Sequence, residues 1–138
     1  MNLSQNIKIT LVNAAAVSAG TEIDATAVDM IGFDGVVFVA SVATANAGNF
    51  MKAQSDTDVA LGTVADLAGT KAVAGTNGAF IGVDVYRPIK RYVRPVVIRA
   101  GANTAVGDIY AIQYAGRTRP VVNAGMILSV SPADGTVS

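Results

Sequence analysis

The sequence predicts an all-β fold, namely a single-domain antiparallel sandwich that is jelly-roll-like and contains at most one short helical turn. Apolar runs alternate with turn signals about every ten to fifteen residues, a spacing typical of sandwiches and small barrels. Ala, Val, Gly and Thr supply half of the 138 residues; Val and Thr favour strands, whereas Gly favours turns. Because no linker or fixed-period repeat divides the chain, we expect one domain over residues 1–138.

The N-terminal part predicts two strands with a small-residue segment between them. Ile7, Ile9 and Leu11 alternate with polar residues, which is the period of a half-buried strand. Residues 14–20 are small, and we expect them to be flexible. A second short strand is expected over residues 21–24.

The next part predicts the centre of the core. Asp34-Gly35 is a tight-turn signal, and residues 36–42 that follow are apolar on both faces. We therefore expect a central strand there. The small and polar residues 45–48 turn the chain into a further strand over 49–55.

Residues 56–70 are where the sequence allows a helical turn. Thr63 followed by Asp66 resembles an N-terminal capping arrangement, and Gly69 would end the turn. Asn77-Gly78 is a strong hairpin signal for the chain that follows it.

Three further strands are expected in the second half. Residues 79–85 alternate, with Ile81, Val83 and Val85 on one face. Pro95 within residues 89–100 has no N–H to donate, so this strand should lie at an edge or carry a bulge. Residues 108–114 alternate again, and from about residue 124 we expect a flexible tail.

The residue inventory disfavours catalysis. The chain has no His and no Cys, which removes the commonest general base, thiol nucleophiles and most transition-metal ligands. The acid pairs Glu22/Asp24 and Asp56/Asp58 lack the further oxygen ligands that a calcium loop needs. We expect no enzyme activity, no catalytic residues, no cofactor and no metal.

Charge is divided unevenly along the chain. Residues 1–86 carry three lysines and eight acids, whereas residues 87–138 carry seven cations and two acids, so the net charge is zero. This division favours a protein that meets complementary surfaces, its own copies or those of another protein. The N-terminus shows no signal-peptide pattern, and no apolar run approaches the ~18 residues of a membrane span.

The segment from Tyr86 to Arg99 is the candidate interface, because it holds four of the six arginines together with tyrosines. Tyr and Arg dominate interface hot spots. An ordinary solvated edge and a single-stranded nucleic-acid platform are the alternatives. The candidate residues are Tyr86, Arg87, Lys90, Arg91, Tyr92, Arg94, Arg99, Arg117 and Arg119.

Several motifs in this part of the chain also suggest a family. They are RYVRPVV at 91–97, a Gly/Asn turn, AIQY at 111–114 and R-x-x-P-V at 117–121; GFDGVVF at 32–38 and DLAGT at 66–70 fit the same pattern. Over about residues 30–122 the chain thus resembles a family of small virion proteins of tailed bacteriophages.

The resemblance implies a capsid cement, or decoration, protein that binds the outside of an icosahedral shell and stabilises it. The implied partners are the major capsid protein and other copies of the chain, as a dimer or trimer, with no membrane and no direct nucleic-acid contact expected. The implied location is the capsid surface of a virion, after synthesis in the host cytoplasm. A head–tail connector or tail-tube subunit is one alternative, and a nucleic-acid or glycan binding module is another.

Overall fold

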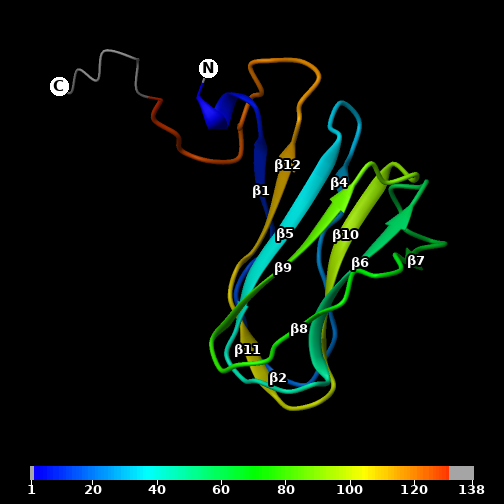
Figure 1. Ribbon diagram of the computed structural model, residues 1–138, viewed down its shortest axis with the longest axis vertical. Helices are drawn as coiled ribbons and strands as arrows, with labels where there is room; N and C mark the ends of the chain where they lie inside the picture. Colours follow the sequence, from blue (N-terminus) through cyan, green and yellow to red (C-terminus); the bar gives the residue numbers. More distant parts are fainter. Residues whose placement is uncertain (1, 131–138) are drawn as a thin grey trace.

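The computed structural model describes residues 2–130 and consists of two antiparallel sheets that form a sandwich (Figure 1). The first sheet contains β1 (Lys8–Asn13), β2 (Ala16–Ala19), β5 (Gly35–Val42), β9 (Ala79–Tyr86), β11 (Thr104–Val106) and β12 (Ile109–Tyr114). The second contains β3 (Ile23–Asp24), β4 (Val28–Asp29), β6 (Asn49–Asp56), β7 (Ala65–Asp66), β8 (Ala72–Val73) and β10 (Tyr92–Arg99). The predicted all-β antiparallel sandwich is confirmed.

The first sheet is built around β5, as its apolar sequence predicts. β9 pairs with β5 along its whole length on one side, while β12 and β11 pair with it on the other. β1 lies outside β12, and β2 lies outside β11. Val36, Phe38 and Val42 of β5 are fully buried, which confirms the predicted central strand.

The second sheet is built around the pair β10–β6, which matches all eight residues of each strand. Its edges are the two-residue strands β3 and β4 on one side and β7 and β8 on the other. Very short edge strands are a common protection against edge-to-edge aggregation. The long strands of this sheet are therefore covered on both sides.

β10 is an inner strand of this sheet, so the predicted edge position of Pro95 is wrong, but the register shifts by one residue between β3 and β4, opposite Pro95, in agreement with the predicted bulge. β3 pairs with β10 at Val96 and Val97, and β4 pairs with it at Tyr92 and Val93. Pro95 falls in the gap between these two short neighbours, where no N–H is needed. Its carbonyl still accepts a hydrogen bond from the Ala25 amide at 3.2 Å.

The core lies between the sheets and is filled by alternate residues of the long strands. Ile81, Val83 and Val85 of β9 all face it, as their alternation predicts. Fully burying one such side chain contributes about 1.5–3 kcal/mol relative to leaving it exposed. The largest side chains with no exposed surface are Phe38, Met51, Val93, Val97 and Ile109.

Two expectations for the N-terminal part are wrong. In β1 the strand begins at Lys8, and the face that carries Ile9 and Leu11 points outward: Leu11 is 52% exposed, whereas Val12 on the opposite face is buried. Residues 14–20, expected to be flexible, contain β2, which pairs with β11. The small side chains there leave room for pairing that local composition does not reveal.

The helical turn expected within residues 56–70 is also wrong. Thr63 does not cap a helix; its amide and hydroxyl both donate to the carboxylate of Asp56. Asp56 also accepts the amide of Asp58, so one buried carboxylate closes this loop. Among residues 2–130 the helical structure is a single 3-10 turn, Leu3–Gln5.

Asn77-Gly78 forms a turn, but the turn does not join two paired strands. β8, before it, pairs with β6 in the second sheet, whereas β9, after it, pairs with β5 in the first. Gly78 has a φ of 70°, which glycine adopts readily, and its amide donates to the carbonyl of Ala43. The predicted hairpin is therefore a crossing between sheets.

The expected C-terminal tail begins beside the N-terminus. Asn123 accepts the amide of Ile9 and donates to the carbonyls of Ser4 and Ile7. Residues 124–130 form no strand or helix and are exposed. The rest of the expected tail, residues 131–138, lies outside the described residues.

Candidate protein interface

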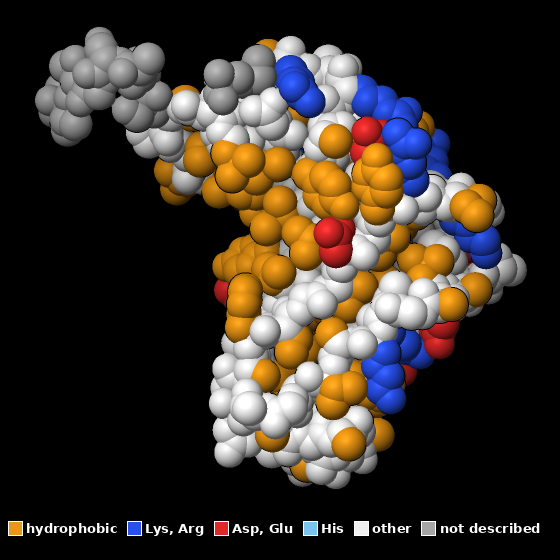
Figure 2. Space-filling view, in the orientation of Figure 1, with side chains coloured by type: hydrophobic (Ala, Val, Ile, Leu, Met, Phe, Trp, Pro, Cys, Tyr) orange, Lys and Arg blue, Asp and Glu red, His pale blue; other side chains and the backbone are white. Residues whose placement is uncertain are grey.

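Five of the predicted interface residues gather at the end of the sandwich where β9 ends and β10 begins. Lys and Arg side chains cluster there (Figure 2). Four of them, Arg87, Lys90, Arg91 and Arg117, line an open hollow of about 590 Å³ together with Ile31 and Ile89. These six residues are called the basic end below. Tyr86, 61% exposed, precedes Arg87 on β9.

The loop that carries the basic end is fixed at both of its ends. At one end, the Arg87 amide donates to the carbonyl of Asp34. At the other end, the carbonyl of Arg91 accepts a hydrogen bond from the Met30 amide at 2.9 Å. Arg87 has a φ of 50°, a left-handed conformation that costs a non-glycine residue about 1 kcal/mol. The loop therefore holds its side chains on a rigid base.

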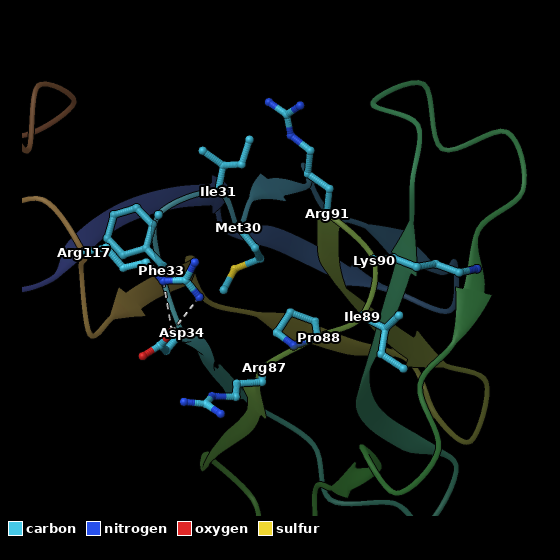
Figure 3. A pocket seen from close by; sticks show the side chains of 11 residues that line it. Met30, Ile31, Phe33, Asp34, Arg87, Pro88, Ile89, Lys90, Arg91 and Arg117 are labelled. Carbon is cyan, nitrogen blue, oxygen red and sulfur yellow. Dashed lines mark hydrogen bonds and ion pairs between the residues drawn. The ribbon is translucent and has the colours of Figure 1, made fainter.

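The side chains of the basic end spread outward around an apolar floor (Figure 3). Met30, Phe33 and Pro88 line the hollow, and Lys90 and Arg91 extend away from it. Ile89 is fully exposed and Ile31 is 63% exposed. Exposed aliphatic side chains among cations are available for contact with another surface.

Two of these cations are already paired. Arg91 forms two hydrogen bonds with Asp29, at 2.9 and 2.7 Å, which lower the pKa of that carboxyl and raise the pKa of the guanidinium. Arg117 donates to Asp34 at 2.9 and 3.3 Å. Within residues 2–130, neither Arg87 nor Lys90 forms an ion pair.

The tyrosines and Arg119 lie around this cluster without lining the hollow. The guanidinium of Arg87 lies 5.2 Å from the ring centroid of Tyr86, and that of Arg91 lies 5.1 Å from the ring of Tyr92. Such cation–π contacts hold the arginines over their neighbours. Arg119 is exposed and donates to the carbonyl of Gly116 at 3.0 Å.

Arg94 and Arg99 do not join the basic end. Arg94 lies on the outer face of the second sheet, where it donates to Gln54 and lies 4.0 Å from Asp24. Arg99 is 5% exposed, at the other end of β10. Its guanidinium donates to the carbonyls of Val17, Thr21 and Thr104 and to the Thr21 hydroxyl, so within this chain it holds loops together.

The sequence did not identify the apolar members of this site. Ile89 had a recognisable signal, because an isoleucine between Pro88 and Lys90 in a loop has no core to enter. Ile31 and Asp34 come from a distant loop, and nothing in the local sequence connects them with Arg87 or Arg117.

Residues 2–130 contain no group of three or more His, Cys, Asp or Glu placed to hold a metal ion. In the same range, no helix has the length and apolar character to cross a membrane.

A comparison with solved structures finds a similar fold in the crystal structure of the PBSX exported protein XepA. The TM-score is 0.57 and the sequence identity 22%, over 97% of this chain and 46% of that one. The chain thus spans about half the length of XepA, and the likeness establishes a shared fold. No protein-family model and no curated protein matches the chain.

Proposed function

We propose that this chain is a non-catalytic protein of a phage particle that attaches through its basic end to the outside of the capsid shell, as a cement protein does. The observation that carries the proposal is the rigid loop around Ile89, where Arg87 and Lys90 have no carboxylate partner within the described chain. The site is suited to an acidic surface with an apolar centre.

Each part of the basic end has a distinct task in this proposal. Ile31 and Ile89 lose exposed apolar surface on contact, which favours binding. Arg87 and Lys90 select acidic partners and set the orientation. A stable interface buries about 1,200–2,000 Å² in total, so the neighbouring Tyr86 would also be covered.

The phage setting is supported by the sequence motifs and by the description of a structural neighbour. XepA is described as an exported protein of PBSX and is phage-derived. Export of the neighbour favours a second candidate, in which this chain acts outside the particle. If this chain is absent from purified phage particles, the second candidate is favoured.

The charges support protein attachment over a nucleic-acid platform. A phosphate track needs several cations without partners. Arg91 and Arg117 are neutralised by Asp29 and Asp34, while Arg94 is engaged by Gln54. The remaining free cations at the basic end, Arg87 and Lys90, are too few for a continuous track.

The test adds the purified protein to capsids that lack it and measures co-sedimentation and shell survival on heating. We expect wild-type protein to bind and to raise the temperature at which shells break. The double variant Arg87→Glu, Lys90→Glu should bind at least about tenfold more weakly, because it meets acidic groups with like charge.

Lys71→Glu is the matched control, since Lys71 is an exposed cation outside the basic end. It should bind as wild type does. Equal binding by wild type and the double variant would refute the role of the basic end. Binding to single-stranded DNA that falls steeply with salt would instead support the nucleic-acid alternative, and particle imaging that finds the protein at one vertex or in the tail would support a connector.

A further inference from the structure

The outer face of the first sheet is apolar and exposed, with fewer charged residues than the outer face of the second. Outward residues of a sandwich strand are normally polar. On the second sheet the outward residues are mixed: Lys52 pairs with Asp66 and Arg94 with Gln54, whereas Phe50 lies opposite Ile98. On the first sheet, hydrophobic side chains gather over β1, β12, β5 and β9 (Figure 2). We call this the outer sheet face; its central members are Leu11, Val37, Val39, Phe80, Tyr110 and Ile112.

The strand register makes the outer sheet face continuous across the sheet. Leu11 lies opposite Tyr110, Tyr110 opposite Val39, and Val39 opposite Gly82. Gly82 has no side chain, and a Cβ there would approach the carbonyl oxygen of Phe38 to 3.0 Å. The outer sheet face is therefore recessed at Gly82 of β9, and the side chain of Phe80, which is 76% exposed, projects beside it.

Tyr114 forms the boundary of the outer sheet face toward the basic end. Its ring lies over Gly35, and its hydroxyl donates to Asp84 at 2.6 Å. Burial, together with this hydrogen bond, raises the pKa of Tyr114 to about 12. The apolar part of the outer sheet face thus ends at the hydrogen-bonded pair Tyr114–Asp84, which separates it from the basic end.

The C-terminal segment 126–130 is a second apolar element, and its side chains stay exposed among the described residues. Ile127 is fully exposed, and Met126, Leu128 and Val130 are 38–43% exposed. No charged residue occurs between positions 120 and 130. The segment is anchored at Asn123 beside β1, and it then leads away from the body of the protein (Figure 1).

We propose that the outer sheet face of one copy binds segment 126–130 of a second copy. Within residues 2–130 a single chain leaves both apolar surfaces exposed, whereas an exchange between copies covers both. The direction of the segment away from its own sheet favours the neighbouring copy. The contact joins two different surfaces, so two reciprocal contacts close a dimer, and a repeated one-way contact closes a ring. This proposal deepens the self-association expected of a cement protein, and it needs no capsid.

The test measures the mass of the full chain by sedimentation equilibrium over a range of concentrations, without capsids. A segment variant combines Ile127→Asp and Leu128→Asp; a face variant combines Leu11→Glu and Phe80→Glu. All four side chains are more than 40% exposed, so both variants should fold, which far-UV circular dichroism will check. We expect each variant to associate at least about tenfold more weakly than wild type, because an ionised group must be buried at the contact.

Mixing the two variants gives the decisive measurement. The segment variant keeps an intact sheet face and the face variant keeps an intact segment, so the mixture should recover heterodimers held by one contact. Ser129→Glu adds charge within the segment without removing an apolar side chain; it serves as the comparison and should associate more strongly than the segment variant.

Cross-linking gives an independent measurement, since the chain contains no cysteine. Ile127→Cys mixed with Leu11→Cys should form a mixed disulfide dimer, and Ile127→Cys mixed with Val59→Cys should not. A monomeric wild type would overturn the proposal, as would a segment variant that associates normally. The two proposals can fail separately. If wild type fails to bind capsids but still self-associates, this inference stands and the proposed function fails. If wild type binds capsids but stays monomeric, the proposed function stands and this inference fails.

Discussion

Arg91 and Arg99 lie at opposite ends of β10, and they are held in different ways. Arg91 is exposed and forms a two-point ion pair with one carboxylate, that of Asp29. Arg99 is buried and donates to three backbone carbonyls and a hydroxyl, with no ion pair among the described residues. The same residue type therefore serves a surface at one end of the strand and the scaffold at the other.

The acids show the same difference on the two sides of Tyr92. Asp29 on β4 and Asp56 on β6 both lie opposite this residue. Asp29 faces the side chain of Arg91, whereas Asp56 is buried and accepts backbone amides of its own loop. Asp29 also accepts the amide of Ile31 but remains exposed, so burial is what separates the acid that supports the fold from the acid at the surface.

Arg99→Ala should give the largest loss of stability. It leaves the buried carbonyl of Thr104 and the partly buried carbonyls of Val17 and Thr21 without their donor, at about 1–3 kcal/mol each where water does not replace it. We expect the free energy of unfolding to fall by about 3 kcal/mol or more, measured by urea denaturation.

Arg99→Lys is the matched control, because it keeps the charge but loses the planar fork that reaches several acceptors. It should lie between wild type and Arg99→Ala. If Arg99→Ala unfolds at the wild-type urea concentration, the distinction between the two ends of β10 does not hold.

Asp56→Asn should give the next largest effect, and the effect should depend on pH. The amide of Asp58 and the amide and hydroxyl of Thr63 donate to this carboxylate and lower its pKa below the ordinary value of an aspartate. A lowered pKa in the folded state stabilises the protein above the unfolded value, and that stability is lost as the pH falls through the folded pKa. Near neutral pH, Asp56→Asn should therefore be less stable than wild type.

The difference between Asp56→Asn and wild type should shrink as the pH falls below about 4, because the wild-type carboxylate is then protonated as well. Denaturant midpoints measured from pH 7 to pH 2 will check this. A constant difference over that range would show that the loop needs the shape of the side chain and not its charge.

Sequence reasoning predicted the parts of this fold that depend on local pattern. The alternation of Ile81, Val83 and Val85 identified the buried face of β9, and the apolar run of β5 identified the centre of the first sheet. Both follow from the two-residue period of a strand. The pattern failed at β1, because alternation does not tell which face points inward, and the face with Leu11 lies on the outside of the sheet.

The remaining errors concern contacts between distant segments. The sequence predicts an edge or a bulge at Pro95, and no local rule predicts that β10 is an inner strand whose short neighbours β3 and β4 leave a gap there. Arg99 was grouped with the interface arginines because its sequence neighbours are basic. The carbonyls that accept hydrogen bonds from Arg99 belong to residues about eighty positions earlier and five positions later in the chain.

Arg87→Gly should have a smaller effect, and in the opposite direction. Arg87 has a φ of 50°, and glycine adopts that conformation at little cost. Removing the strain should raise the free energy of unfolding by about 0.5 kcal/mol, less than the full cost because glycine also gains freedom in the unfolded chain. Capsid attachment should weaken at the same time, and unchanged attachment would remove Arg87 from the basic end.

Arg91→Gln should give the smallest change in stability and thus completes the comparison with Arg99. The Asp29 partner is exposed, so it returns to water when the guanidinium is removed, and exposed ion pairs contribute little to folding. We expect a urea midpoint that cannot be distinguished from wild type, together with an Asp29 pKa that returns toward its ordinary value, measured by NMR titration. A loss comparable to that of Arg99→Ala would mean that Arg91 also holds the scaffold, and the basic end would then be a by-product of folding rather than a surface kept for binding.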